Sequence, residues 1–335
     1  MGATYPLGER LVKPGYLLRV PLLILIVWLM LPVAGQAQGL AAFAPINPMA
    51  TSRSGLAFEP YRAERPGRWS GSLSLDYAST IEVNNRPAAN YLLDSELLRV
   101  RLDLVRDLSP RLFLRAGVEV DGAYAGFLDG FLRWYHRLLG IAIPEREKRP
   151  RNSFLYEIAL PGRVPIFRRS SDLFLGDIRL GAGVRIRPGL QSVAYLTLPT
   201  STGPAGYGRG VVSANLVNTL QAQLWRRLVF EGSLGIGYTP THGDLAPVQR
   251  ETMLSASSGL RFRVLGRHSI YANIFYHSPY YRGTTLRALD RRDLSIDFGW
   301  MLALKKGGDW RIGMTEDLEP DGPAIDLIFR LGRSF

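Results

Sequence analysis

Apolar and polar residues alternate along most of the chain. From Arg68 to Glu82 (RWSGSLSLDYASTIE) the odd-numbered positions are mainly apolar or aromatic and the even-numbered positions are mainly polar. Successive side chains of a β-strand point to opposite faces, so this segment is predicted to be a strand with one apolar and one polar face. The alternation recurs near residues 98–104, 112–120, 152–160, 174–186, 191–199, 211–224, 228–238, 253–263, 269–278, 293–304, 309–316 and 325–331.

The connections between these segments are of two kinds. Short ones occur near residues 109–110, 188–190, 225–227, 265–268 and 305–308, and longer ones such as PTSTGPAGYGRG and SPYYRGTTLRALDRR lie between them. Barrels of the bacterial outer membrane combine short turns on one side with longer loops on the other, and their strand number is even. The pattern predicts an all-β chain that forms a transmembrane antiparallel β-barrel of about 12 strands, with 14 as the alternative. A soluble β-sandwich also alternates, but charged rows opposite long aliphatic rows favour the barrel.

The N-terminal residues have the order of a secretory signal peptide. Arg10, Lys13 and Arg19 precede an apolar run over residues 20–34, and small residues follow it. We therefore predict a signal peptide over residues 1–37 with cleavage after Ala37. The sequence contains no cysteine, which excludes disulfides, thiolate metal sites and a lipid-anchored N-terminal cysteine.

The rest of the chain divides into two parts. Residues 38–67 are rich in proline, alanine and serine and are either a periplasmic leader or a plug inside the lumen, and residues 68–335 are the barrel. The chain ends on Phe335 with apolar residues at alternate positions before it, which resembles the C-terminal signature of bacterial outer-membrane barrels. Phe335 is thus predicted to be an assembly signal for the barrel assembly machinery, and the location to be the cell outer membrane.

If the aliphatic rows face lipid, the charged rows face the lumen. The candidate lumen-lining residues are Arg99, Arg101, Arg115, Asp177, Arg179, Arg185, Arg187, Arg261 and Arg263. Two interpretations stay open: a pore whose arginine rows favour anionic solutes, or a lumen that is closed by mutually paired arginines and carboxylates.

The segment FLDGFLRWYHRLLGIAIP, residues 127–144, departs from the alternation. Its apolar residues come every three or four positions, so a short amphipathic helix is predicted in one loop, ending near Gly140. The residues of its apolar side are Phe127, Phe131, Trp134, Tyr135 and Leu138. Such a helix could cap the barrel mouth, lie as an anchor at the lipid interface, or only pack against the barrel wall.

Motifs for catalysis, cofactors or metals are absent from the sequence. It contains no HExxH, CxxC or P-loop pattern, and neither His277 with Ser278 nor His242 with Asp244 has the spacing of a triad. We therefore expect no enzyme activity and no cofactor, with a rim-active hydrolase as the least favoured alternative. The net charge of +12 would suit nucleic acid, but an exported barrel would instead meet outer-membrane lipids and lipopolysaccharide phosphate.

Three segments resemble those of a Gram-negative outer-membrane family known only as a domain of unknown function. They are LDGFLRWYHRLLGIAIPEREKRPRNSF, LFLGDIRLGAG and LTLPTSTG. The matching residues are Asp129, Gly130, Phe131, His136, Gly140, Pro144, Gly176, Asp177, Leu198, Pro199, Thr200 and Gly203. The last motif departs from the family's pattern by the inserted Ser201 and Thr202. The resemblance implies a barrel and no established activity, so the function predicted is a channel or transporter for small solutes, the alternative being a structural or surface-interaction barrel with a closed lumen.

Overall fold

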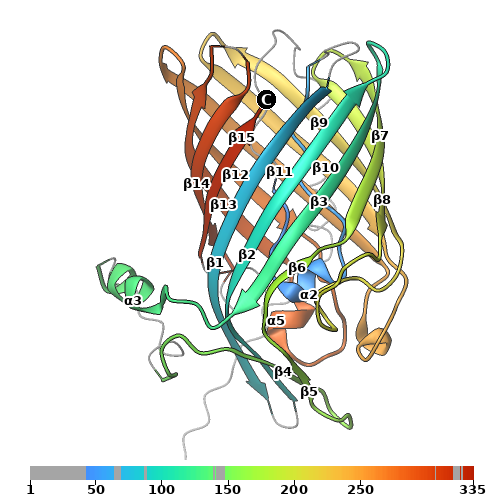
Figure 1. Cartoon of the computed structure of the whole chain (residues 1–335), viewed down its shortest axis with the longest axis vertical. Coiled ribbons are helices and arrows are strands. Elements are labelled where there is room, and N and C mark those ends of the chain that lie inside the picture. Colours follow the sequence, from blue (N-terminus) through green and yellow to red (C-terminus); the bar gives the residue numbers. More distant parts are fainter. Residues whose placement is uncertain are drawn as a thin grey trace, which may run out of the picture.

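A computed structural model describes residues 43–63, 69–86, 89–138, 140, 148–305, 307–319, 325 and 327–335; the predicted signal peptide lies outside them. Twelve antiparallel strands form a closed barrel (Figure 1). The ring closes because β1 pairs with both β2 and β15, which confirms the predicted strand number. The barrel strands are β1 (Trp69–Arg86), β2 (Ala89–Asp107), β3 (Leu112–Tyr124), β7 (Ile178–Arg187), β8 (Leu190–Leu198), β9 (Ser213–Trp225), β10 (Leu228–Tyr238), β11 (Thr252–Leu265), β12 (His268–His277), β13 (Asp293–Ala303), β14 (Asp309–Asp317) and β15 (Leu327–Ser334).

Three further strands do not add to the ring. β4 (Leu155–Ala159) pairs with the part of β2 that projects beyond the barrel, and β5 (Ile166–Arg168) pairs with the other edge of β4. β6 (Ser171–Leu175) pairs with β3 just as β7 does, so β6 and β7 form one strand that is interrupted at Gly176 and Asp177. The predicted strand over residues 152–160 therefore exists, but outside the ring, which explains why the sequence contains an odd number of strand-like segments.

The two ends of the barrel differ. The short turns that join β2 to β3, β7 to β8, β9 to β10, β11 to β12 and β13 to β14 gather at one end, here called the turn end, together with the C-terminus (Figure 1, top). The opposite end, here called the loop end, bears the long connections, β4 and β5, and the short helices α2 (Pro48–Thr51), α5 (Arg287–Asp290) and η1 (Ala246–Val248). None of the helices in the described part of the chain is long and apolar enough to cross a membrane.

The two faces of the wall carry opposite kinds of side chain. Outward positions are aliphatic and exposed, as Leu114, Leu180 and Ile236 are, whereas the alternate positions are charged and buried, as Arg115 and Glu231 are. This arrangement of side chains is the reverse of that in a soluble protein, whose apolar side chains lie inside. The distribution fits a barrel that presents an apolar belt to hydrocarbon and a polar interior.

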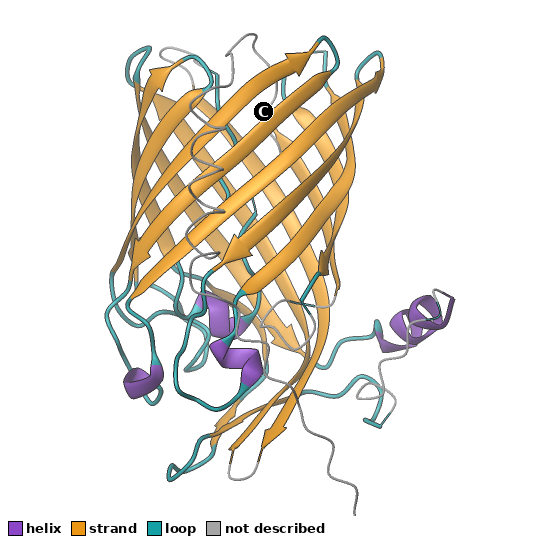
Figure 2. Cartoon of the chain, turned by 180° about the vertical axis from the view of Figure 1, so that it is seen from behind, coloured by secondary structure: helices purple, strands orange, loops and turns teal. Residues whose placement is uncertain are grey.

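Helix α3 (Asp129–Leu138) lies beside the barrel and not over its mouth (Figures 1 and 2). The Phe131 ring lies 5.9 Å from the ring of Phe329 on β15, and the Tyr135 hydroxyl donates to Glu316 on β14 at 3.4 Å. Phe127 packs near Tyr77 on the outer wall, with 5.6 Å between ring centroids, while Trp134 and Leu138 are exposed. The predicted apolar side thus partly contacts the wall and partly remains uncovered.

The ends of α3 follow from local hydrogen bonds. Glu96 on β2 accepts from the backbone N–H groups of Phe127, at 2.7 Å, and of Leu128, which satisfies donors before the first turn. Gly140 has a φ of +70° and donates to the carbonyl of Arg137, a conformation that stops a helix and that glycine adopts without strain. The side chain of His136 and residue Pro144, both part of the family resemblance, lie outside the described part.

We expect Phe131→Ala to loosen α3 from the wall. Aromatic pairs contribute about 0.5–1.5 kcal/mol beyond their buried area, so losing the contact with Phe329 should accelerate trypsin cleavage within α3, at Arg133 or Arg137, by roughly two- to tenfold. Leu138→Ala, on the exposed part of the same side, is the matched control and should cleave as the native chain does. Equal cleavage rates in all three proteins would show that the contact does not hold the helix.

Candidate functional site in the barrel lumen

Residues 43–63 fold into a hairpin inside the barrel and are called the plug below (blue in Figure 1). Phe43 and Phe58 exchange both backbone hydrogen bonds, at 3.1 and 2.7 Å, so two arms run antiparallel along the lumen. Helix α2 joins the arms at the loop end, and Asn47 caps it by accepting from the N–H of Met49 at 2.8 Å. The segment that the sequence leaves as leader or plug therefore lies in the lumen over its described residues.

Glu59 is the centre of the charged contacts between plug and wall. Its fully buried carboxylate lies 3.3 Å from a guanidinium nitrogen of Arg101 and 3.4 Å from one of Arg179, and it also pairs with Arg115. Asp103 lies between two of these cations, 2.8 Å from Arg101 and 3.2 Å from Arg115. These five residues are called the Glu59 cluster. Buried charges of this kind are stable only when they are paired, so the plug supplies a carboxylate that the wall arginines need.

Neighbouring strands bring the cluster together. Arg101 and Asp103 lie on β2 opposite Glu119 and Gly117 of β3, and Gly117 in turn lies opposite Arg179 on β7. Alternation alone places their side chains on the inner face, and pairing between adjacent strands sets them side by side. Gly117 leaves room for the contact, because a Cβ there would come within 2.9 Å of an Asp103 oxygen.

The first arm of the plug is held by Arg99. Its guanidinium donates to the carbonyl of Pro45 at 2.8 Å and pairs with Asp121 at 3.0 Å and Glu119 at 3.4 Å. The second arm is held towards the turn end, where Arg185 donates to the carbonyl of Arg62 at 2.9 Å and pairs with Asp107 at 2.7 Å. The guanidinium groups of Arg99 and Arg185 thus bind backbone carbonyls of both arms.

Arg53 fixes the outer part of the second arm without a carboxylate. Its guanidinium donates to the carbonyls of Thr239 at 2.7 Å, Pro240 at 2.9 Å and Arg250 at 2.9 Å. Burial lowers the pKa of Arg53 from its ordinary value, but arginine remains a cation at neutral pH. The plug is therefore tied to the loops at one end and to the wall along its length.

His277 is part of this fastening and not of a catalytic triad. Its Nδ1 lies 2.6 Å from the carbonyl oxygen of Ser278, so Nδ1 carries the proton, and in the neutral ring Nε2 accepts from the hydroxyl of Ser54 at 2.7 Å. The position that a catalytic carboxylate would occupy at Nδ1 is taken by a backbone carbonyl. Among the described residues no group of histidine, aspartate and glutamate is arranged to hold a metal ion.

The candidate lumen residues divide into three groups. Arg99, Arg101, Arg115, Arg179 and Arg185 are buried and contact the plug or its cluster, and Arg261 is buried in the wall. Asp177 is buried at the interruption between β6 and β7, where it pairs with Arg209 at 3.1 Å. Arg187 and Arg263 are exposed near the ends of β7 and β11, where the strands reach the rim at the turn end, and that they line the lumen remains a prediction.

Glu59 and Arg53 were not among the predicted site residues. Both lie in a proline- and alanine-rich segment without periodicity, so no pattern assigns them a face. One feature of the sequence could have pointed to them. Arg53 and Glu59 are charged residues between short apolar stretches, and the segment that contains them precedes a barrel with a charged lumen.

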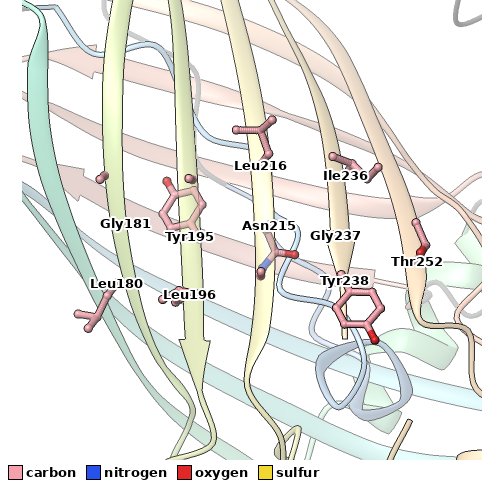
Figure 3. Close-up of a pocket in the computed structure, with 13 residues that line it drawn as sticks. Leu180, Gly181, Tyr195, Leu196, Asn215, Leu216, Ile236, Gly237, Tyr238 and Thr252 are labelled. Carbon is pink, nitrogen blue, oxygen red and sulfur yellow. The ribbon is translucent and has the colours of Figure 1, made fainter. Parts of the chain in front are cut away.

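A hollow of about 680 Å³ lies on the outer face of the wall, across β7 to β11 (Figure 3). It forms where the outward residues Ala182, Ala194 and Ala214 are small between larger neighbours such as Leu196 and Leu216. No charged residue lines it. It belongs to the apolar outer surface and is separate from the plugged lumen.

Comparisons with known proteins find one family and several similar solved structures. The family model described as protein of unknown function, DUF3187, matches residues 46–335. The COG4313 outer membrane channel from Pseudomonas putida F1 is 15% identical, with 82% of this chain and 98% of that chain covered and a TM-score of 0.50. A Pseudomonas aeruginosa FadL homologue is 9% identical, with 90% and 99% covered and a TM-score of 0.43, and the NanC porin is 8% identical, with 80% and 99% covered and a TM-score of 0.44. No curated protein sequence matches the chain.

Proposed function

The chain belongs to the DUF3187 family, and we propose that it is an outer-membrane channel for small solutes that is kept closed by its own plug. The observation that carries the proposal is a charged lumen filled by a segment that hydrogen bonds and ion pairs attach to the wall, beside the ring contacts of Phe43 and Phe58 with Phe275. Eight-stranded barrels are just filled by their side chains, whereas barrels of 16–18 strands enclose an aqueous channel. A twelve-stranded barrel lies between them, so its lumen would hold water once the plug left it.

The charged contacts of the plug favour a displaceable segment over a permanent core, while its Phe43 and Phe58 also pack against Phe275 of the wall. A lumen that only had to be filled could use apolar side chains, which are often as stabilising as buried ion pairs or more so. Charged groups lose less on separation, because water rehydrates both partners as the lumen opens. The Glu59 cluster and the Arg53 contacts are of this separable kind.

The proposed orientation follows from the two ends. The turn end, with Phe335, would face the periplasm, where the barrel assembly machinery reads the C-terminal strand, and the loop end would face outward. Trp134 and Leu138 on α3 are exposed 53% and 68%, and would then lie at the outer lipid interface near lipopolysaccharide.

The alternative function is a barrel whose lumen never conducts. The specific observation in its favour is the complete burial of Glu59 among three arginines, which holds the plug firmly. Liposome swelling separates the two. For a channel that its plug keeps closed, we expect vesicles that contain the full chain to admit small solutes slowly, and clearly faster than empty vesicles do once mild urea loosens the plug. Swelling at the rate of empty vesicles under both conditions would contradict the channel.

Charge selectivity should follow the wall arginines once the plug is removed. In a chain that lacks residues 43–63 we expect Arg115→Glu with Arg179→Glu to shift the reversal potential towards cations, because rings of charged side chains set the selectivity of a pore. Arg187→Glu with Arg263→Glu is the matched control, since these side chains are exposed at the rim. A shift of equal size in the control would assign selectivity to the rim and not to the lumen.

A further inference from the structure

A cavity of about 240 Å³ opens at the loop end, directly outside the plug, and is called the vestibule below. Its walls are the glycine-rich loop over residues 203–210, the loop over residues 242–245 and the last residue of β5. Met49 and Ser52 of the plug line it together with Tyr281. A solute that reached the lumen from the loop end would therefore meet these loops and the outer end of the plug first.

Two arginines line the vestibule with unused hydrogen-bonding capacity. The side chains of Arg168 and Arg209 are only 12% and 9% exposed, and the Nε–H of each is buried without an acceptor in the described part of the chain. A buried donor that lacks an acceptor costs about 1–3 kcal/mol. An oxygen atom supplied by a ligand could remove this cost.

The two arginines differ in how firmly they are engaged. Arg209 lies 3.1 Å from Asp177, whose side chain is 2% exposed and also accepts from the backbone N–H groups of Ser201 at 3.0 Å and Arg209 at 2.9 Å. Arg168 instead lies 3.4 Å from a single oxygen of Asp244, whose side chain is 62% exposed. Exposed single-point ion pairs contribute little, about 0–1 kcal/mol. The carboxylate on Arg168 is thus the exchangeable one.

The glycine-rich loop is shaped around Arg168. Gly206 has a φ of +92°, and a Cβ there would come within 2.7 Å of the Arg168 Nε. Only glycine lets the backbone pass so close to the guanidinium in that conformation. The backbone of the glycine-rich loop therefore defines the space beside Arg168.

We propose that the vestibule binds a small organic anion, whose carboxylate takes the place of Asp244 on Arg168 and whose body rests against Met49 and Tyr281. The proposal rests on the proposed function in that it names the substrate class of the same channel. At about 30 Å³ for one water molecule, the cavity holds roughly eight waters, which suits a compound the size of benzoate. Because Met49 belongs to the plug, the bound anion would touch the segment that closes the lumen.

The test is isothermal titration calorimetry of the full chain in detergent micelles with sodium benzoate. Benzamide is the uncharged probe of the same shape. We expect benzoate to bind at least about tenfold more tightly than benzamide, since charge-assisted hydrogen bonds to arginine are roughly twice as strong as neutral ones. Arg168→Gln should remove this difference. Asp244→Asn, which frees the guanidinium and leaves the loop its size, should tighten benzoate binding severalfold.

Arg169→Gln is the matched control, because it removes the same charge from the adjacent, exposed position. Each variant is first checked for the heat-sensitive gel mobility of a folded barrel. Equal binding of benzoate and benzamide, no binding of either, or equal losses in Arg168→Gln and Arg169→Gln would overturn the site. If benzoate binds as expected but vesicles with the full chain do not swell even in mild urea, the channel fails and the site stands. If the vesicles swell in mild urea but benzoate does not bind, the site fails and the channel stands.

Discussion

Deleting residues 43–63 is expected to raise the single-channel conductance of the barrel in planar bilayers at least about tenfold, because a twelve-stranded ring without its plug encloses a continuous aqueous path. The plug fills the lumen from α2 at the loop end to Arg62 near the turn end. The measurement is the distribution of current steps at fixed voltage and salt.

The barrel itself should survive the deletion. Its strands are held by a continuous ladder of backbone hydrogen bonds that closes between β1 and β15, and none of these bonds involves the plug. The wall arginines that lose Glu59 gain water in its place, and Asp103 and Glu119 remain beside them. Hydration of an open lumen therefore replaces the buried ion pairs.

Deleting residues 127–140 is the control for this experiment. It removes α3, which lies outside the ring, and should leave the conductance near that of the full chain. A chain without the plug that folds, inserts and still shows no larger current steps would mean that the lumen is closed by its own wall. That result would support the structural barrel as the function.

The ring could be predicted from the sequence because the period of two assigns each strand residue to a face. Leu180 and Arg179 illustrate this: one is exposed on the outer wall and the other is buried beside Glu59. The period does not say where a strand leaves the barrel. For this reason residues 155–159 look like a wall strand although they pair beyond the ring.

The plug could not be placed from the sequence because its contacts are not periodic. Arg53 reaches three backbone carbonyls more than 180 residues away in the chain, and Glu59 reaches strands β2, β3 and β7. Such contacts depend on the closed shape of the barrel, which only the folded chain provides. The helix predicted within residues 127–140 is confirmed as α3, Asp129–Leu138. Whether it lies over the mouth or beside the wall depends on Phe329 and Glu316, which are distant in sequence.

Replacing Glu59 by glutamine should release the plug more often. The substitution Glu59→Gln would keep the size of the side chain but leave Arg101, Arg115 and Arg179 without the buried carboxylate that they share. Removing one partner of a buried ion pair costs about 3–5 kcal/mol. Since each 1.4 kcal/mol is a factor of about ten, the plug-free fraction should rise by at least about 100-fold, visible as frequent openings to the step size of the chain without residues 43–63.

A double variant separates loss of pairing from loss of fold. When Arg115→Gln is added to Glu59→Gln, the cation that lost its carboxylate is also removed. The double variant should therefore open less often than the sum of the effects of the two single variants predicts. Trypsin cleavage at Arg53 or Arg62 within the plug provides a second readout and should follow the open fraction. Asp172→Asn, which removes a carboxylate from an exposed position on β6, should behave as the native chain does. If the effects of Glu59→Gln and Arg115→Gln are simply additive, the ion pair does not hold the plug. Its hold then comes from the backbone contacts of Arg53, Arg99 and Arg185 and from the packing of Phe43 and Phe58 on Phe275.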